Sequence, residues 1–264
     1  MIIAHLSDPH VDVDGTEFHN LYQTTDKFKV AIEKVCLLSP KPEAIVITGD
    51  LVNNGNAEAY DIFNDILKLT EIPVYLGIGN HDCRETFRTA FSDHAYLPEA
   101  GFIQYAWDMN GHQMIMLDTN IPNEPGGILC SERLAWLDKT LLSTNDTPTT
   151  IFMHHPPFKT GIKAMDDMGL EDADAFGAII KKHKQIQRIY CGHLHRSIQS
   201  DFYGVQTQIC PSTTHKVLLH LEDTDRLATT AEPSEILLHM WDKDGNIVTH
   251  SCFTEPYPIL WESD

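Results

Sequence analysis

Short apolar runs alternate with helix-like stretches from the N-terminus to about residue 190. Six runs have the length and side chains of buried strands, and they cover residues 2–6, 44–48, 74–78, 114–117, 150–153 and 188–191. Between them, apolar residues recur at the spacing of amphipathic helices over residues 28–36, 59–67, 132–142 and 172–183. Alternating strands and helices of this kind predict an α/β fold, with a sheet packed between helices.

After residue 195 the pattern changes to strands separated by tight turns. Tyr203-Gly204 marks one turn, and Asp244-Gly245 separates two strand-like segments, 235–241 and 247–253. An earlier hairpin is predicted at Asn110-Gly111, between residues 105–109 and 113–117. The acidic stretch 222–234 reads as a loop or excursion, and no repeat or linker interrupts the chain. We therefore expect one domain with a β-rich C-terminal extension.

Composition narrows the cellular setting and the kind of ligand. The six cysteines are far apart and form no C-x-x-C pair, and the first residues lack a basic region followed by a long apolar run. Both features favour a cytoplasmic protein. The formal net charge of -19 opposes binding to nucleic acid polymers and to anionic membranes. A small substrate is therefore expected.

Polar clusters follow five of the predicted strands directly, where loops leave an α/β sheet and ligands usually bind. The clusters are Asp8-Pro9-His10, Gly49-Asp50, Gly79-Asn80-His81-Asp82, His154-His155 and Gly192-His193-Leu194-His195. A single cluster of this kind often serves only a turn or a helix cap. In an extended segment, residues i and i+2 point the same way, so Asp-x-His and His-x-His can each grip one ion. Five clusters at successive strand ends predict one shared site.

The donor atoms in these clusters suit divalent metals. Imidazole nitrogens with carboxylate and amide oxygens accept Zn, Fe, Mn or Co, and the set does not choose among them. Cys83 and Cys191 lie beside the clusters and are interpreted as structural. If one carboxylate bridges two ions, seven protein ligands give each ion four and leave positions open for water and substrate. Neither a Gly-x-Ser-x-Gly elbow nor a Walker loop is present to offer another nucleophile or phosphate site.

The ordered series of five clusters resembles the signature of the calcineurin-like metallophosphoesterases, over about the first three quarters of the chain. Within that superfamily, Gly-Asn-His-Asp at 79–82 and His-His-Pro-Pro at 154–157 resemble the class III cyclic-nucleotide phosphodiesterases and their glycerophosphodiesterase relatives. The segment 210–217, with Pro211 and His215, resembles a substrate-side loop of the latter. The resemblance implies a four-layer αββα sandwich. Residues 1–195 would form the catalytic core, and residues 196–264 would add second-sheet strands and a cap or oligomerisation extension for a homo-oligomer.

The same resemblance implies a role for each residue. The first metal would be held by Asp8, His10, Asp50 and His195, and the second by Asp50, Asn80, His154 and His193. Asp50 would then bridge the two ions, and a hydroxide between them would attack phosphorus. His81 would face the leaving group, Asn80, His81 and His215 would contact substrate, and His155 and Asp82 would orient the ligands.

Three functions are compatible with this reading. The first is hydrolysis of a small phosphodiester, a cyclic nucleotide or a glycerophosphodiester. The second is phosphomonoester hydrolysis, for which related protein phosphatases carry an Asp-Arg pair after Gly-Asp; here Leu51-Val52-Asn53-Asn54-Gly55 follows instead, and Arg84 or Arg196 would have to replace the clamp. The third is a metal-free binding scaffold, which would be expected to have lost ligands. The diesterase is favoured, because all ligands are present and the Asp-Arg pair is absent.

Overall fold

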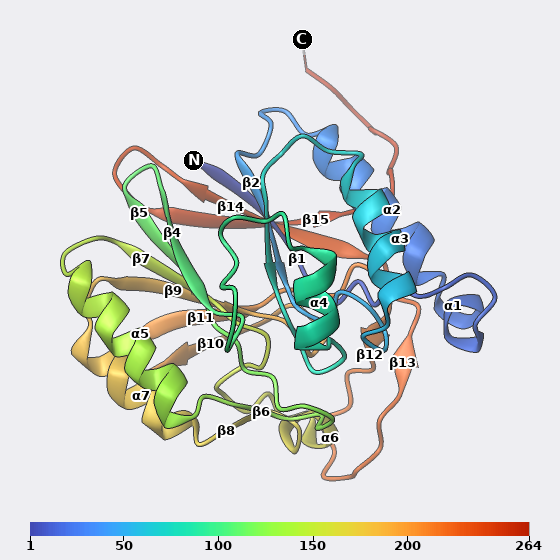
Figure 1. Cartoon of the computed structure of the whole chain (residues 1–264). Coiled ribbons are helices and arrows are strands. Elements are labelled where there is room, and N and C mark those ends of the chain that lie inside the picture. Colours follow the sequence, from blue (N-terminus) through green and yellow to red (C-terminus); the bar gives the residue numbers. More distant parts are fainter. Residues whose placement is uncertain (264) are drawn as a thin grey trace.

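Two mixed β-sheets face each other in the computed structural model, which describes residues 1–263 (Figure 1). The first sheet has the order β15-β14-β1-β2-β3, with β1 Ile2–Leu6, β2 Ala44–Thr48, β3 Val74–Gly77, β14 Glu235–Trp241 and β15 Ile247–Phe253. The second has the order β10-β11-β9-β7-β5-β4, with β4 Tyr105–Met109, β5 His112–Met116, β7 Thr149–Phe152, β9 Ile186–Cys191, β10 Ile198–Phe202 and β11 Val205–Ile209. Two small pairs, β6 Gly127–Ile128 with β8 Leu170–Glu171 and β12 Lys216–Val217 with β13 Thr229–Thr230, complete the strands.

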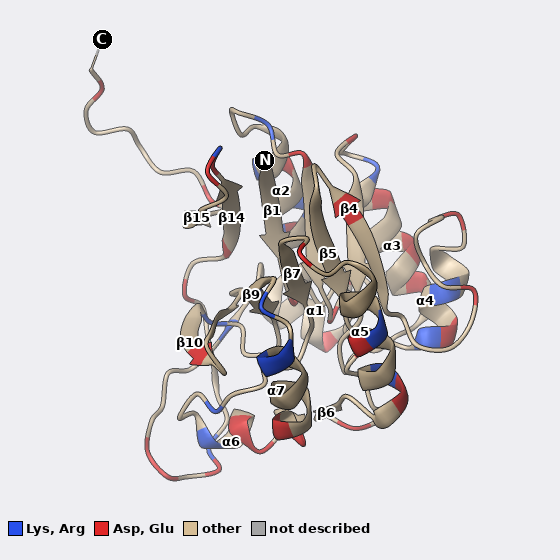
Figure 2. Cartoon of the chain, turned by 90° about the vertical axis from the view of Figure 1, so that its left-hand side faces the viewer, with Lys and Arg blue, Asp and Glu red and all other residues tan. Residues whose placement is uncertain are grey.

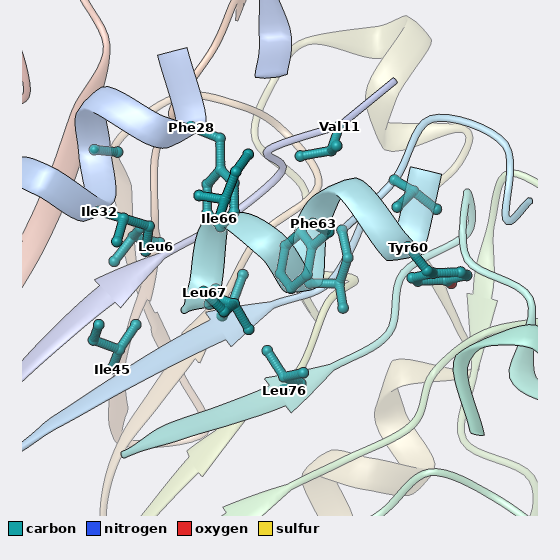
Figure 3. Packing of buried hydrophobic residues seen from close by; sticks show 14 of the residues in the cluster. Leu6, Val11, Phe28, Ile32, Ile45, Tyr60, Phe63, Ile66, Leu67 and Leu76 are labelled. Carbon is teal, nitrogen blue, oxygen red and sulfur yellow. The ribbon is translucent and has the colours of Figure 1, made fainter. Parts of the chain in front are cut away.

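Helices cover the outer face of each sheet. The first sheet packs against α2 Thr24–Cys36, α3 Ala57–Leu67 and α4 Arg84–Ala90, and the second against α5 Ser131–Ser143 and α7 Ala173–Lys182. Figure 3 shows the first of these cores, where Phe28 of α2 and Phe63 of α3 lie over Ile45 and Leu76 of the sheet. Two short helices, α1 Glu17–Tyr22 and α6 Lys163–Asp166, lie outside these layers.

A third apolar core fills the space between the sheets. Ile3 and Val46 of the first sheet pack there with Met114, Phe152 and Tyr190 of the second. Their chain neighbours point to the outer cores, so both faces of β1 and β2 are buried, which explains why these strands are apolar at nearly every position. The expected four-layer αββα sandwich is confirmed.

The C-terminal strands extend both sheets. β10 and β11 join the second sheet beside β9, whereas β14 pairs antiparallel with β1 in the first sheet and β15 pairs with β14. From the sequence, the strands after residue 195 were expected in the second sheet. Only β10 and β11 lie there; β14 and β15 join the first sheet, where the apolar face of β14 is buried beside β1. Stretch 222–234, expected as a loop, contains the short strand β13.

Surface charge agrees with the composition. On the face shown in Figure 2, basic segments are short and separated by acidic or neutral ones, so no continuous basic stripe tracks across it. All six cysteines are free within residues 1–263. In the same range, no helix combines the length and apolar character needed to cross a membrane.

Candidate metal centre

The five polar clusters meet where five parallel strands end. Strands β1, β2 and β3 run parallel in the first sheet, and β7 and β9 run parallel in the second, so their carboxyl ends lie on one side. The loops leaving these ends carry all seven residues expected as metal ligands, which are Asp8, His10, Asp50, Asn80, His154, His193 and His195. Six of these side chains are almost fully buried, and Asn80 is half-buried.

Four of the expected ligands form a compact first group. Asp8, His10, Asp50 and His195 offer donor atoms that all lie within 4.8 Å of one another. The Nε2 atoms of His10 and His195 are 3.1 Å apart, and His195 Nε2 is 3.5 Å from Asp8 Oδ1. Such a concentration of lone pairs around one point fits a single cation.

The second group lies on the other side of Asp50. His154 Nε2 is 3.1 Å from Asn80 Oδ1 and 3.4 Å from Asp50 Oδ2. The His193 ring lies 5.1 Å from the His154 ring, and its buried Nε2 has no hydrogen-bond partner. Asp50 Oδ2 is also 3.5 Å from His10 Nε2, so one carboxylate oxygen contacts both groups. This is the geometry that a bridging ligand requires.

His155 also lies close enough to His154 and His193 to count as a metal-ligand candidate. Both of its ring nitrogens are already engaged, however. Nδ1 lies 2.8 Å from the Thr119 hydroxyl, and Nε2 lies 3.1 Å from the Pro125 carbonyl oxygen. With no free lone pair directed at the site, His155 is better suited to orient the loop than to bind an ion.

Backbone acceptors determine which imidazole nitrogen faces the site. His154 Nδ1 donates to the Thr48 carbonyl at 2.8 Å, and His195 Nδ1 donates to the His215 carbonyl at 3.0 Å. Each ring therefore directs its Nε2 lone pair inward, as metal-ligating histidines commonly do. Asp82 acts on the loops in a similar way, since it accepts from the backbone N–H groups of Leu51 and Gly79.

The loops reach this arrangement through unusual backbone conformations. Five of the seven ligands have positive φ, from 45° to 74°, namely Asp8, His10, Asp50, His193 and His195. Non-glycine residues rarely adopt this region, and they cluster in it at functional sites. Gly79 is required for a different reason, because a Cβ there would lie 2.2 Å from Asp50 Oδ1.

The electrostatics of the site also fit a bound cation. Burial lowers the pKa of His193 to about 3 and that of His10 well below its usual value, so both rings keep a free lone pair. Burial alone would also lower the pKa of His154, but Asp50 and Asp8 outweigh it and raise this pKa to about 9. Burial alone would raise the pKa of Asp50, but His154, His81 and His10 outweigh it and hold this pKa well below its usual value. Ionised carboxylates, neutral imidazoles at His10 and His193, and a His154 ring that can give up its proton to a metal form the donor set that divalent ions need.

We expect metal binding to release a proton and to strengthen as pH rises towards 9. The metal-free site holds a proton on His154 below its pKa of about 9, and a metal ion must displace it. Calorimetric titration at pH 7 in two buffers of different ionisation enthalpy would count the proton released. An apparent affinity that does not change between pH 6 and pH 9 would contradict histidine ligation.

Two of the three residues expected to contact substrate, His81 and His215, lie beside the metal-ligand cluster, and the third, Asn80, lies within it. His81 is exposed, with Nδ1 2.6 Å from the Asn53 carbonyl oxygen and its ring 4.6 Å from that of His10. His215 packs its ring on Tyr22 at 4.2 Å and lies 4.5 Å from the ring of His195. Both rings therefore border the metal-ligand cluster without belonging to it.

Both arginines near the site segments are already paired with carboxylates. Arg84 makes two 2.7 Å hydrogen bonds to Asp118, and Arg196 makes a bidentate pair with Glu232 at 2.8 and 2.9 Å. Neither guanidinium is free to clamp a phosphate. The hollow above the metal ligands is lined by no lysine or arginine among residues 1–263.

A sixth polar cluster, Asp118-Thr119-Asn120, follows β5 and was not among the predicted site segments. Asp118 is fully buried between Arg84 and Arg133, and the Asn120 side chain donates to the Gly79 carbonyl at 2.6 Å. Thr119 lies beside His155 as described above. The signal was available, because these three polar residues follow a predicted strand as the other clusters do.

Replacing Asp118 with alanine should destabilise the protein by about 3–5 kcal/mol, since removing one partner leaves the buried guanidinium charges unpaired. Urea unfolding of the metal-free protein measures this change. Glu232→Ala is the matched control, and it should cost less than about 1 kcal/mol because the Glu232 side chain is 42% exposed to solvent. Equal effects of the two substitutions would contradict the assigned role of Asp118.

Comparisons with known proteins agree with the geometry. The family model described as calcineurin-like phosphoesterase matches residues 1–197. A probable glycerophosphodiester phosphodiesterase of Arcobacter nitrofigilis is 30% identical, over 99% of this chain and 98% of its own length. A probable cyclic nucleotide phosphodiesterase of Rhodopseudomonas palustris is also 30% identical, over 94% of this chain and 90% of its own.

Among solved structures, a dimetal phosphatase from Danio rerio matches with a TM-score of 0.66 at 14% identity, covering 94% of this chain and 98% of that one. Similarity at this identity supports the fold alone. The family-model match, and the two relatives that align over nearly the whole chain, also establish the family. The chain belongs to the calcineurin-like phosphoesterases.

Proposed function

We propose that this protein hydrolyses small phosphodiesters, cyclic nucleotides or glycerophosphodiesters, at a site that holds two divalent metal ions. The observation that carries the proposal is the position of Asp50, whose carboxylate contacts both ligand groups. The names of the two 30% identical relatives point to the same reaction class. A metal-free binding scaffold is disfavoured, because the chain retains every expected ligand.

The ligand assignments follow the two groups. Asp8, His10, Asp50 and His195 would hold one ion, and Asp50, Asn80, His154 and His193 the other. Divalent ions at these positions supply a nucleophile by lowering the pKa of water and neutralise charge on the phosphate. Which of Fe, Mn, Zn or Co occupies them is left open by the donor atoms.

The protein's own groups then orient and protonate the substrate. His81 donates Nδ1–H to the Asn53 carbonyl, so its Nε2 faces outward beside the ligand cluster. We propose that His81, as an imidazolium, donates a proton to the leaving oxygen. We propose that Asn80 and His215 also contact the substrate, from opposite sides of the phosphate.

We further propose that residues 1–264 act as one domain, in the cytoplasm. The core shared by the two sheets supports the first point, and the six free cysteines support the second. Strand β15 leaves one edge of the first sheet unpaired within the described chain, and such an edge can pair with a second copy in a homo-oligomer.

A comparison of diester with monoester substrates tests the reaction class. A monoester near neutral pH carries close to two negative charges, and enzymes for it tend to add a cationic clamp, whereas Arg84 and Arg196 are both neutralised here. We therefore expect kcat/KM to be higher for bis(p-nitrophenyl) phosphate than for p-nitrophenyl phosphate. If the monoester is preferred with both metals bound, the phosphomonoesterase alternative is correct.

A further inference from the structure

Above the metal ligands lies a cavity of about 210 Å³ with an apolar wall. Site histidines form part of its lining, and the wall is built by Phe18, Met165, Met168, Val217 and Leu227. Within residues 1–263, Asp50 is the one carboxylate in the lining, which contains no lysine or arginine and includes five histidines. A group that enters this cavity beside the phosphate therefore meets hydrocarbon on the wall and imidazole rings on the side of the metal centre.

Three separate segments hold this wall in place. Phe18 and Tyr22 lie one turn apart on α1, and the Tyr22 hydroxyl lies 2.9 Å from the Thr229 hydroxyl of β13. The strap, defined as residues 218–228 between β12 and β13, carries Leu227 and is tied to α6 by the Lys163–Asp225 ion pair. In Figure 1 this loop descends past α6 before returning through β13. The segments that form the cavity wall are therefore held together by specific polar contacts.

Parts of the wall are also anchored in the main core. Met165 and Val217 are 5% exposed and belong to the apolar cluster beneath the second sheet. Leu227 differs, since 52% of its surface is exposed on the strap. Substitution of Leu227 can therefore change the chemistry of the cavity without removing a core side chain.

A second hollow of about 420 Å³ lies next to the first and has the opposite character. Its lining includes the side chains of Asn53, Asn54, Asn123 and Glu124, which offer amide and carboxylate groups. It shares Asn80, His81 and Pro125 with the apolar cavity. The ligand Asn80 and the exposed ring of His81 thus lie between a polar hollow and an apolar one.

We infer that the site is built for an asymmetric diester, with an uncharged apolar ester group in the cavity and a hydroxyl-bearing group in the amide-lined hollow. This inference rests on the proposed diesterase function and adds the chemistry of the two groups on phosphorus. Hydroxyls can exchange hydrogen bonds with amides and a carboxylate. A cationic head group such as choline would be desolvated against hydrocarbon in the cavity, which is costly without a partner. Long-range attraction by the net charge of -19 works against this selectivity, so the local wall must produce it.

Two substrates of equal shape test the apolar side. Glycerophosphocholine and its isostere, the 3,3-dimethylbutyl ester of glycerol phosphate, differ only in a charged nitrogen replaced by carbon. Both are mixed with the metal-loaded enzyme, and their disappearance is followed by phosphorus NMR, which gives the ratio of the two kcat/KM values. We expect the uncharged isostere to be preferred by about tenfold or more, because the cost of burying an unpaired cation exceeds the 1.4 kcal/mol that tenfold represents.

A matched pair of variants assigns the preference to the cavity. Leu227→Asp places a carboxylate on the wall and should shift the ratio towards the choline ester by about tenfold. Leu219→Asp makes the same change at an exposed leucine of the strap outside the cavity lining, and it should leave the ratio unchanged. Equal shifts in both variants would overturn the assignment to the cavity.

Two further outcomes would also overturn the inference, and a third concerns the function. A ratio near one in the wild type removes the selectivity. A choline preference that disappears in Glu124→Gln places the cation in the polar hollow. If the enzyme gives one of these two results but still hydrolyses bis(p-nitrophenyl) phosphate, the inference about the two hollows is wrong and the proposed diesterase function stands. If no diester is hydrolysed by protein containing two metals, the proposed function itself fails.

Discussion

Replacing Asp50 with asparagine should remove most of the bound metal and lower diester turnover by more than about 100-fold. Substitution of a residue that only supports a metal ligand costs up to about 100-fold, and loss of a carboxylate that contacts both ligand groups should cost more. The substitution keeps size and shape, and the amide oxygen can still accept from the His81 backbone N–H that now lies 2.9 Å from Asp50 Oδ1. The change removes the negative charge that contacts both ligand groups. Elemental analysis of purified protein, with turnover measured on the same sample, checks this result.

Asp8→Asn is the matched control for that experiment. Asp8 Oδ1 lies 3.5 Å from His195 Nε2 and farther, 4.0 Å, from His154 Nε2, so its loss should weaken one ion more than the other. Unfolding of both variants in their metal-free forms shows whether a loss of activity reflects the site or the fold. An Asp50→Asn protein that keeps two tightly bound ions would refute the bridging assignment.

The second large effect is expected at His81, where alanine should lower turnover of an alkyl diester by about 10²- to 10⁴-fold, as is typical for loss of a general acid. The exposed ring lies beside the ligand cluster, and its Nδ1 proton is committed to the Asn53 carbonyl. Nε2 is therefore the atom that can protonate a leaving oxygen. Metal content should stay near that of the wild type, because His81 is outside both ligand groups.

Leaving-group dependence separates proton donation from simple positioning. Nitrophenolate leaves without much protonation, so bis(p-nitrophenyl) phosphate should lose far less activity in His81→Ala than a glycerophosphodiester does. Equal losses on the two substrates would exclude the acid role and leave a positioning one. A large loss of metal would instead show that the ring supports the ligand shell.

Most of the fold could be predicted from periodicity, because central strands such as β1 and β2 are buried on both faces and the edge strand β4 alternates between buried and exposed positions. Strands β1, β2, β4, β14 and β15 have the predicted bounds, and the helical spacing of apolar residues marked α2, α3, α5 and α7. β5 begins two residues earlier than the apolar run, since hairpin pairing continues to His112 and Met109 beside the turn. Hydrogen bonding there, and not hydrophobicity, decides where the strand starts.

Elements held by long-range contacts could not be read from local pattern. β14 pairs with β1 more than 230 residues away, and nothing in either segment specifies that partner. Helices α1 and α6 have only six and four residues, too few for an apolar period to appear. Both border the cavity, so its chemistry became visible only in three dimensions.

The site could be located from sequence for a simple reason. Parallel strands bring their carboxyl ends to one side, so polar residues after successive strands converge. The same rule should have included Asp118-Thr119-Asn120, which supports the loops without reaching the centre. The family resemblance predicted ligation by His154 and orientation by His155. The His-His pair by itself could not separate these roles, because they depend on whether a ring nitrogen is free or bonded to Thr119 and Pro125.

Stepwise metal reconstitution would show whether hydrolysis requires two bound ions. The protein is stripped of metal and then titrated with Mn²⁺ or Zn²⁺, and hydrolysis of bis(p-nitrophenyl) phosphate is followed against the number of ions bound per chain. We expect an inactive metal-free protein, two ions bound at saturation, and turnover that appears with the second equivalent. Full turnover with one ion, or with none, would contradict a binuclear diesterase.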